Sequence, residues 1–190
     1  MPITRDDRPA LLLIDIQKAF DDVAYWGGQR NNLDAERNAG KLLSLWRVRR
    51  LPVFHVQHCS STPTSLLHES NEGNGFKDIV KPADGEPVIR KNVNSAFIGT
   101  DLQERLEADG IRTVVIVGLT TDHCVSTTVR MAGNLGFDVF VVSDATATFN
   151  KKGFGGQDFP AELIHDTALA SLDGEFATVV TTRSLEERIQ

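Results

Sequence analysis

The sequence has few cysteines and no long apolar run. Cys59 and Cys124 are the only two among 190 residues, too few for the disulfide framework of a small secreted protein. Nowhere do about 18 apolar residues follow one another, so no transmembrane helix is predicted. The first residues, 1–7, are polar and lack the apolar core of a signal peptide. These absences favour a cytoplasmic protein with free thiols and no membrane association.

The sequence also lacks an excess of positive charge. It has 20 Lys and Arg against 26 Asp and Glu, a net charge of −6, and an acidic surface repels the phosphates of nucleic acids. The basic cluster of Arg47, Arg49 and Arg50 falls at the end of a predicted helix, where the helix dipole favours cations. Nucleic acid is therefore not an expected partner.

The composition is that of a globular protein. Hydrophobic residues make up 41% and charged residues 24%, which excludes a disordered chain, a collagen-like chain and a coiled coil. A chain of this length usually folds around one core. We therefore expect a single domain over residues 1–190.

Short apolar runs rich in Val, Ile and Leu predict the strands of one sheet. The six runs cover residues 10–14, 53–56, 88–89, 113–117, 139–142 and 178–180. Runs that are apolar on both faces fit a parallel sheet covered by helices on both sides. Helical patterns separate most of them, over residues 34–50, 100–110, 125–135 and 160–172. Thr100 and Gln103 form a predicted capping box at the second helix. The alternation predicts a three-layer α/β/α domain.

Two stretches interrupt this alternation. Residues 59–86 are rich in Ser, Thr, Pro, Gly and Asn, and residues 147–159 contain several glycines. Loops of this length in a compact domain usually act as lids or as interface arms. The sequence leaves both roles open, and the arms favour a homo-oligomer of two or more chains.

Polar residues follow three of the predicted strands. Asp15 comes after the first strand, Lys91 after the third, and Cys124 after the fourth, where the chain turns directly into a helix. Ligands bind at this edge of open α/β sheets. Backbone N–H groups at a helix start favour a thiolate and stabilise an oxyanion. A carboxylate can take the thiol proton, and a lysine can keep that carboxylate ionised. The alternatives are a buried core cysteine, a turn aspartate and an exposed lysine.

These residues belong to motifs that resemble the isochorismatase-like cysteine hydrolases. This superfamily includes nicotinamidases, N-carbamoylsarcosine amidohydrolase and isochorismatase itself. The matching segments are residues 12–20, 88–91, 95–97, 117–125 and 143–145. The resemblance implies a six-stranded parallel sheet in the order 3-2-1-4-5-6 and a catalytic triad of Asp15, Lys91 and Cys124. It also implies a cis peptide bond between Leu119 and Thr120, with the N–H groups of Thr120 and Cys124 forming an oxyanion hole.

The implied strand order raises a question about the lysine. The third strand lies two places from the first, roughly 9.6 Å away at ordinary strand spacing. Either Lys91 reaches inward, or the chain after Ile89 turns toward the first strand.

The implied activity is hydrolysis of a C–N bond in a small molecule through a Cys124 thioester, without a cofactor. Small aromatic or ureido-type amides are the expected substrates. Isochorismatase proper resembles this fold but cleaves a vinyl ether and lacks the cysteine. The alternatives are such an ether hydrolase, a catalytically silent binding or assembly protein, and a redox sensor that pairs Cys59 with Cys124.

Candidates for the substrate pocket follow from their places in these motifs and loops. They are Gln17, Phe20, Tyr25, Trp26, Phe97 and Phe154, with Phe20 and Trp26 favoured because they follow Asp15. His123 is a further candidate for a substrate contact. No metal site is expected, because His58, Cys59 and Ser60 stand where nicotinamidases carry an acidic ligand and further histidines. His55, His58 and His68 are interpreted as hydrogen-bonded or packed residues.

Overall fold

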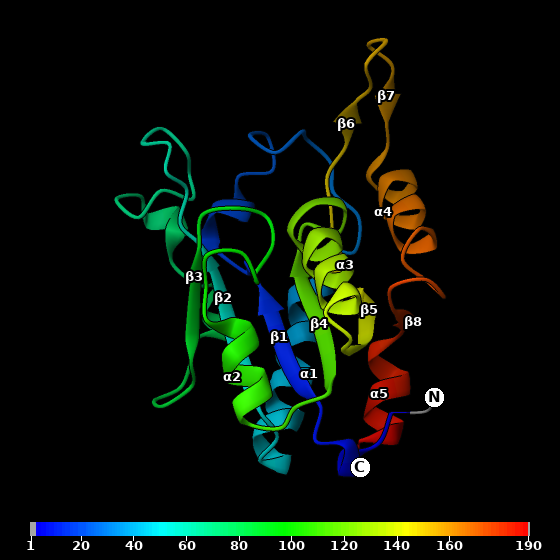
Figure 1. Cartoon of the computed structure of the whole chain (residues 1–190). Coiled ribbons are helices and arrows are strands. Elements are labelled where there is room, and N and C mark those ends of the chain that lie inside the picture. Colours follow the sequence, from blue (N-terminus) through cyan, green and yellow to red (C-terminus); the bar gives the residue numbers. More distant parts are fainter. Residues whose placement is uncertain (1–2, 190) are drawn as a thin grey trace.

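The chain folds around one six-stranded parallel sheet. A computed structural model describes residues 3–189. The strands lie in the order β3-β2-β1-β4-β5-β8 (Figure 1). Their bounds are β1 (Ala10–Ile14), β2 (Val53–His58), β3 (Val88–Lys91), β4 (Thr113–Leu119), β5 (Asp138–Ala147) and β8 (Thr178–Val180). All five pairings are parallel. The predicted fold class and strand order are confirmed, β8 being the sixth strand of the sheet.

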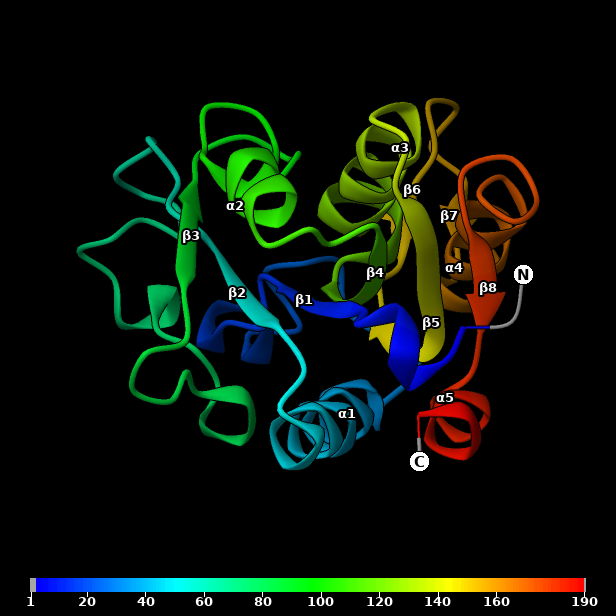
Figure 2. The same cartoon turned by 60° about the horizontal axis from the view of Figure 1, so that its bottom comes forward.

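Helices cover both faces of the sheet (Figure 2). One face carries α1 (Ala35–Arg49) and α5 (Thr182–Arg188), and the other carries α2 (Leu102–Ala108), α3 (Ser126–Asn134) and α4 (Ala161–Ala170). Successive side chains of β1 point to opposite faces of the sheet and so enter both hydrophobic cores. Leu11 and Leu13 join one cluster, while Leu12 and Ile14 join the other. Each such buried side chain stabilises the fold by about 1.5–3 kcal/mol. The apolar runs of the sequence thus fix β1 at the centre of the molecule.

Short helices and a hairpin complete the chain. The helices of one turn are Arg5–Asp7, Lys18–Asp21, Glu72–Asn74 and Asp78–Val80, and a π-helical turn spans Thr121–Val125. Strands β6 (Lys151–Lys152) and β7 (Asp158–Phe159) pair as an antiparallel hairpin. The hairpin projects beyond the carboxyl ends of the sheet strands (Figure 1). The long segment 147–159 is therefore largely this arm.

Two local predictions differ from the structure. The capping box at Thr100 is wrong, because α2 begins one residue later with Asp101 at its N-cap. The Thr100 hydroxyl donates instead to the Ala96 carbonyl at 2.6 Å, and Gln103 bonds Glu107. Helix α5 was not predicted, because Leu185 is the only apolar residue in its seven and so no helical repeat is visible.

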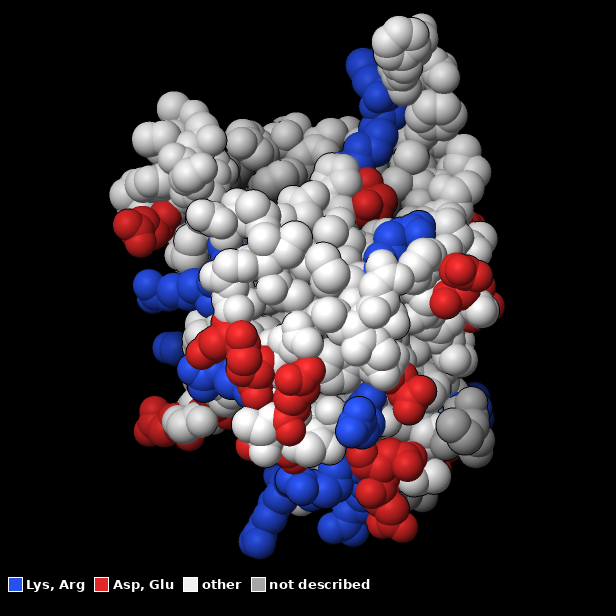
Figure 3. Space-filling model, viewed as in Figure 1, with Lys and Arg blue, Asp and Glu red and all other residues white. Residues whose placement is uncertain are grey.

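The surface carries charges of both signs. On the face shown in Figure 3, acidic and basic side chains mostly gather at the end opposite the carboxyl ends of the strands. Basic side chains also line the hairpin arm, where β6 consists of two lysines. Within residues 3–189, none of the helices is both long and apolar enough to cross a membrane.

Candidate active site

Asp15 occupies a fixed position at the carboxyl edge of the sheet. It directly follows β1 with φ 52°, in the left-handed region that aspartate enters more readily than most residues. It is fully buried. Gly118 of β4 lies opposite Ile14 with φ 129°, and a Cβ added to it would clash with the Ile14 carbonyl oxygen. A glycine at position 118 therefore lets the two strands approach at the place where Asp15 begins.

Lys91 reaches Asp15 across the end of the intervening strand. It is the last residue of β3 and lies opposite His58 of β2. Its Nζ lies 2.6 Å from Asp15 Oδ2 and 3.0 Å from His58 Nδ1. Both members of the Lys91–Asp15 pair are buried, with side chains 0% and 1% exposed. The sequence left two arrangements open for Lys91. The structure shows the one in which the side chain of Lys91 reaches inward.

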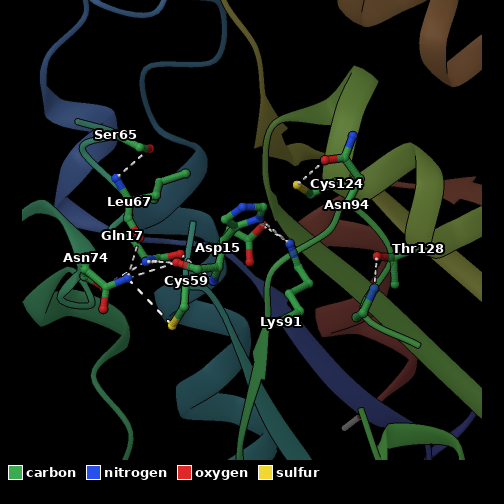
Figure 4. Close-up of polar contacts among 12 residues, drawn as sticks. Asp15, Gln17, Cys59, Ser65, Leu67, Asn74, Lys91, Asn94, Cys124 and Thr128 are labelled. Carbon is green, nitrogen blue, oxygen red and sulfur yellow. Dashed lines mark hydrogen bonds and ion pairs between the residues drawn. The ribbon is translucent and has the colours of Figure 1, made fainter. Parts of the chain in front are cut away.

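The second carboxylate oxygen of Asp15 has no partner. Oδ1 is buried and makes no hydrogen bond within residues 3–189. A carboxylate oxygen of Asp15, a ring nitrogen of His58 and Cys124 Sγ all lie within 4.8 Å of one another. Figure 4 shows Asp15 and Lys91 pointing toward each other, with Cys124 nearby. The structure therefore brings the three residues of the predicted triad together.

Cys124 lies inside the π-helical turn Thr121–Val125 that links β4 to α3. Burial raises the pKa of the half-buried Cys124 thiol, and the charge of Asp15 raises it further, while the charge of Lys91 lowers it. Burial and the charge of Asp15 thus oppose the thiolate that the helix start is expected to favour. Both effects favour the neutral thiol over the thiolate.

The turn that carries Cys124 is held on several sides. The Leu119–Thr120 peptide bond is cis. The Thr120 carbonyl accepts from the N–H groups of His123 and Val125, at 3.2 Å each, and the buried Thr120 hydroxyl has no partner in the described part of the chain. The Thr121 hydroxyl lies 2.9 Å from Nδ1 of His165, a buried residue of α4. The position of the sulfur is therefore set by contacts with α4 as well as with β4.

The hairpin arm contacts the same turn. Lys151 Nζ of β6 lies 3.3 Å from Asp122 Oδ2, and the Thr148 hydroxyl donates to Asp122 Oδ1 at 2.5 Å. Burial opposes ionisation of Asp122, but the Thr148 hydrogen bond and the nearby charges of His123 and Lys151 outweigh it and lower the pKa of that carboxyl. A charged Asp122 thus joins the arm to the segment that presents Cys124.

His58 and Asn94 belong to the site although the sequence did not single them out for it. Burial, and then the charge of Lys91, lower the pKa of His58 below the ordinary 6.5. Asn94 follows β3, and its Oδ1 lies 3.9 Å from Cys124 Sγ (Figure 4). Strand alternation places His58 on the face opposite to His55, which instead meets Glu86 at 2.7 Å. Alternation separates the two histidines, but it does not tell which of them faces the site.

The donor types of Asp15, His58 and Cys124 resemble those of a metal site. The Lys91 ammonium, however, already bonds the Asp15 carboxylate and His58 Nδ1. A divalent ion could bind Asp15 and His58 only by breaking their contacts with the Lys91 ammonium. The two positive charges would then lie side by side. The arrangement therefore fits an organic ion pair rather than a metal centre.

The residues predicted for the pocket have different surroundings. Gln17 is fully buried, and its amide bonds the backbone of His58 and Asn74. Phe20 stacks on Trp26 with ring centroids 4.6 Å apart. Phe97 packs on Phe137 in the core beneath α2 and α3.

The remaining candidates are exposed. His123 has a side chain 57% exposed beside Asp122, and Tyr25 and Phe154 are also exposed. The structure brings none of the predicted pocket residues into hydrogen-bond contact with the Asp15, Lys91 and Cys124 side chains.

Comparisons with known proteins agree with this geometry. A family model described as the isochorismatase domain matches residues 9–184. The isochorismatase family protein YrdC of Bacillus subtilis is 52% identical over 180 residues, which cover 95% of each chain. Nicotinamidase 3 of Arabidopsis thaliana is 32% identical over 193 residues, covering 95% of this chain and 88% of the relative. A crystal structure assigned to a hydrolase of the isochorismatase family from Chromobacterium violaceum is 42% identical. It superposes with a TM-score of 0.94 over 99% of this chain and 97% of that one.

Proposed function

The chain belongs to the isochorismatase family of hydrolases, and we propose that it hydrolyses a C–N bond of a small amide, carbamoyl or ureido compound. Cys124 is the nucleophile, Asp15 moves the protons, and Lys91 keeps Asp15 ionised. The observation that carries the proposal is the buried Oδ1 of Asp15, which has no hydrogen-bond partner among residues 3–189, in a residue with a carboxylate oxygen within 4.8 Å of Cys124 Sγ. A buried carboxylate oxygen normally has a hydrogen-bond donor, and the thiol proton is the donor that this site offers.

The resting site consists of a thiol and a carboxylate. Because burial and Asp15 raise the pKa of Cys124, the sulfur keeps its proton at neutral pH. Asp15 then removes that proton as the sulfur attacks the carbonyl carbon of the substrate, which is general-base catalysis. The products of this step are a protonated Asp15 and a tetrahedral intermediate with a negative oxygen.

In the next steps Asp15 gives up the proton that it took from Cys124. The backbone N–H groups of Thr120 and Cys124 stabilise the negative oxygen, in the manner of an oxyanion hole. Asp15 gives its proton to the nitrogen of the leaving group, the C–N bond breaks, and a Cys124 thioester is left. A water molecule, deprotonated by Asp15, attacks the thioester and releases the acid product and the thiol. Each proton taken up by Asp15 is returned, so the cycle closes.

The class of substrate follows from the nucleophile and from the relatives. A thiol attacks an acyl carbon readily, whereas cleavage of a vinyl ether needs no acyl-enzyme. The relative named nicotinamidase is an amidase by its name. These points favour an amide-type substrate over an ether.

A panel of substrates tests the proposal. Purified protein is offered primary amides, carbamoyl compounds and ureido acids, and the release of ammonia or amine is measured. Isochorismate is offered in parallel, with release of pyruvate as the readout. We expect C–N cleavage by the wild type and by Cys59→Ala, and none by Cys124→Ala or Asp15→Asn. Pyruvate release that persists in Cys124→Ala would refute the proposal in favour of ether hydrolysis.

A further inference from the structure

His58 lies against the proposed catalytic residues, yet the mechanism above gives it no role. It ends β2, between Lys91 of β3 and Asp15 of β1, and its side chain is 13% exposed. Its Nδ1 lies 3.0 Å from Lys91 Nζ and 4.0 Å from Asp15 Oδ2. A mostly buried histidine this close to a buried ion pair influences how that pair is arranged.

The contact with Lys91 determines which ring nitrogen carries the proton. An ammonium group has three donors and no acceptor. A hydrogen bond at 3.0 Å therefore requires an unprotonated Nδ1 on His58. The neutral ring then carries its proton on Nε2. The lowered pKa of His58, caused by burial and then by the Lys91 charge, agrees with a neutral ring at neutral pH.

The backbone of His58 is held by two buried amide side chains. Its N–H donates to Gln17 Oε1 at 2.9 Å, and its carbonyl accepts from Gln17 Nε2 at 3.1 Å and from Asn74 Nδ2 at 2.9 Å. Figure 4 shows Gln17 and Asn74 beside one another, on the side of Asp15 away from Cys124. These contacts fix the backbone from which the ring reaches Lys91.

We propose that His58 is a positioning residue of this site, an inference that rests on the roles proposed above for Asp15 and Lys91. The neutral ring accepts one N–H of the Lys91 ammonium at Nδ1, and a second N–H of the ammonium goes to Asp15 Oδ2. Two fixed acceptors hold the ammonium on the Oδ2 side of the carboxylate. Oδ1 is thereby left for the proton of Cys124.

Protonation of His58 would break the hydrogen bond from the Lys91 ammonium to Nδ1. The charged groups that face the ring are Asp15 from β1 and Lys91 from β3, with the thiols of Cys124 across the site and Cys59 next in the chain. A protonated Nδ1 would point a donor at the ammonium and place two positive charges side by side. The ring would then compete with Lys91 and Cys124 for Asp15. Activity should fall in acid as the ring of His58 takes up a proton.

Nitrogen NMR of the labelled full-length protein tests the protonation state without any substrate. The signals of His58 are identified by their loss in His58→Asn. We expect an unprotonated Nδ1 and a protonated Nε2 at neutral pH, with titration only below pH 6.5. In Lys91→Met the titration should move to higher pH, because the neighbouring positive charge is gone. A ring protonated on Nδ1 at pH 7 would overturn the proposal.

Two substitutions test the positioning role on the substrate found in the panel. His58→Asn keeps an acceptor near the place of Nδ1, whereas His58→Leu removes it and keeps the bulk. We expect His58→Leu to lose about 10- to 100-fold in kcat with little change in KM, as for a reacting group displaced by about an ångström. His58→Asn should retain most of the activity and lose the part of the acid inactivation that His58 causes. His68→Asn and His68→Leu, at a half-buried histidine bonded to Ser70, are the matched controls.

The outcomes separate this inference from the proposed function. Full activity in His58→Leu, with C–N cleavage intact, would overturn the positioning role and leave the proposed function standing. If no amide is cleaved by the wild type, the proposed function fails, and the NMR measurement alone decides whether His58 accepts from Lys91.

Discussion

Replacing Lys91 by methionine should cost both activity and stability, and both losses should depend on pH. Methionine keeps most of the stem of the side chain but removes the ammonium that lies 2.6 Å from Asp15. Breaking a buried ion pair by removing one partner costs about 3–5 kcal/mol. Asp15 escapes part of this cost by taking up a proton, since a buried carboxyl without a cation is disfavoured in its charged form.

The pH dependence of the stability has a defined sign. In Lys91→Met the folded protein holds the Asp15 proton more tightly than the unfolded chain does, and an unfolded aspartate ionises near pH 4, roughly. The variant should therefore come closest to wild-type stability in acid and lose stability as pH rises above about 4. Urea unfolding at several pH values measures this, with an expected deficit of up to about 3–5 kcal/mol at neutral pH.

The activity of the same variant should follow the ionisation of Asp15. A protonated Asp15 cannot take the thiol proton, and general acid–base catalysis contributes about 10²–10⁴-fold. We expect a loss of that order in kcat/KM at neutral pH, with partial recovery at higher pH. Lys77→Met is the control, because Lys77 pairs with Asp21 and Glu36 at 2.7 Å but Arg30 still holds Glu36. Wild-type activity and an unchanged pH profile in Lys91→Met would refute the role given to the lysine.

Three further predictions test the thiol, the strand contact and the cofactor requirement. In a Cys59→Ala background, iodoacetamide should alkylate Cys124 slowly at neutral pH and faster as pH rises; Asp15→Asn should speed the reaction, because the charge of Asp15 raises the pKa of the thiol. Gly118→Ala should lower the melting temperature and kcat together, since its Cβ clashes with the Ile14 carbonyl beside Asp15. Chelator-treated protein should keep its activity on the substrate found in the panel, and loss restored by added metal would contradict this.

The residues alone predicted the α/β class and the common edge of three polar residues, whereas the strand order and the catalytic triad were implied by the family resemblance. In a parallel sheet the carboxyl ends of the strands meet at one edge. Asp15, Lys91 and Cys124 each follow a buried apolar strand, so their positions along the chain already implied a common edge.

The details of the site depend on distances that strand order does not contain. That Lys91 crosses the end of β2 to reach Asp15 follows from the length of its side chain and from its pairing with His58. The raised pKa of the Cys124 thiol follows from burial and from the charge of Asp15, and neither can be read from a helix start. The structural role of Gln17 was missed, because the sequence alone cannot distinguish a buried glutamine that bonds the backbone from one that contacts substrate.

A chemical trap of the acyl-enzyme tests the central claim most directly. Wild-type protein is mixed with a slowly cleaved amide or ester found in the panel and quenched in acid, and its peptides are analysed by mass spectrometry. The account predicts that the peptide containing Cys124 gains the mass of the acyl group, and that the gain disappears in Cys124→Ala together with turnover. Consumption of substrate by Cys124→Ala at the wild-type rate, with no adduct on the wild-type peptide, would contradict it.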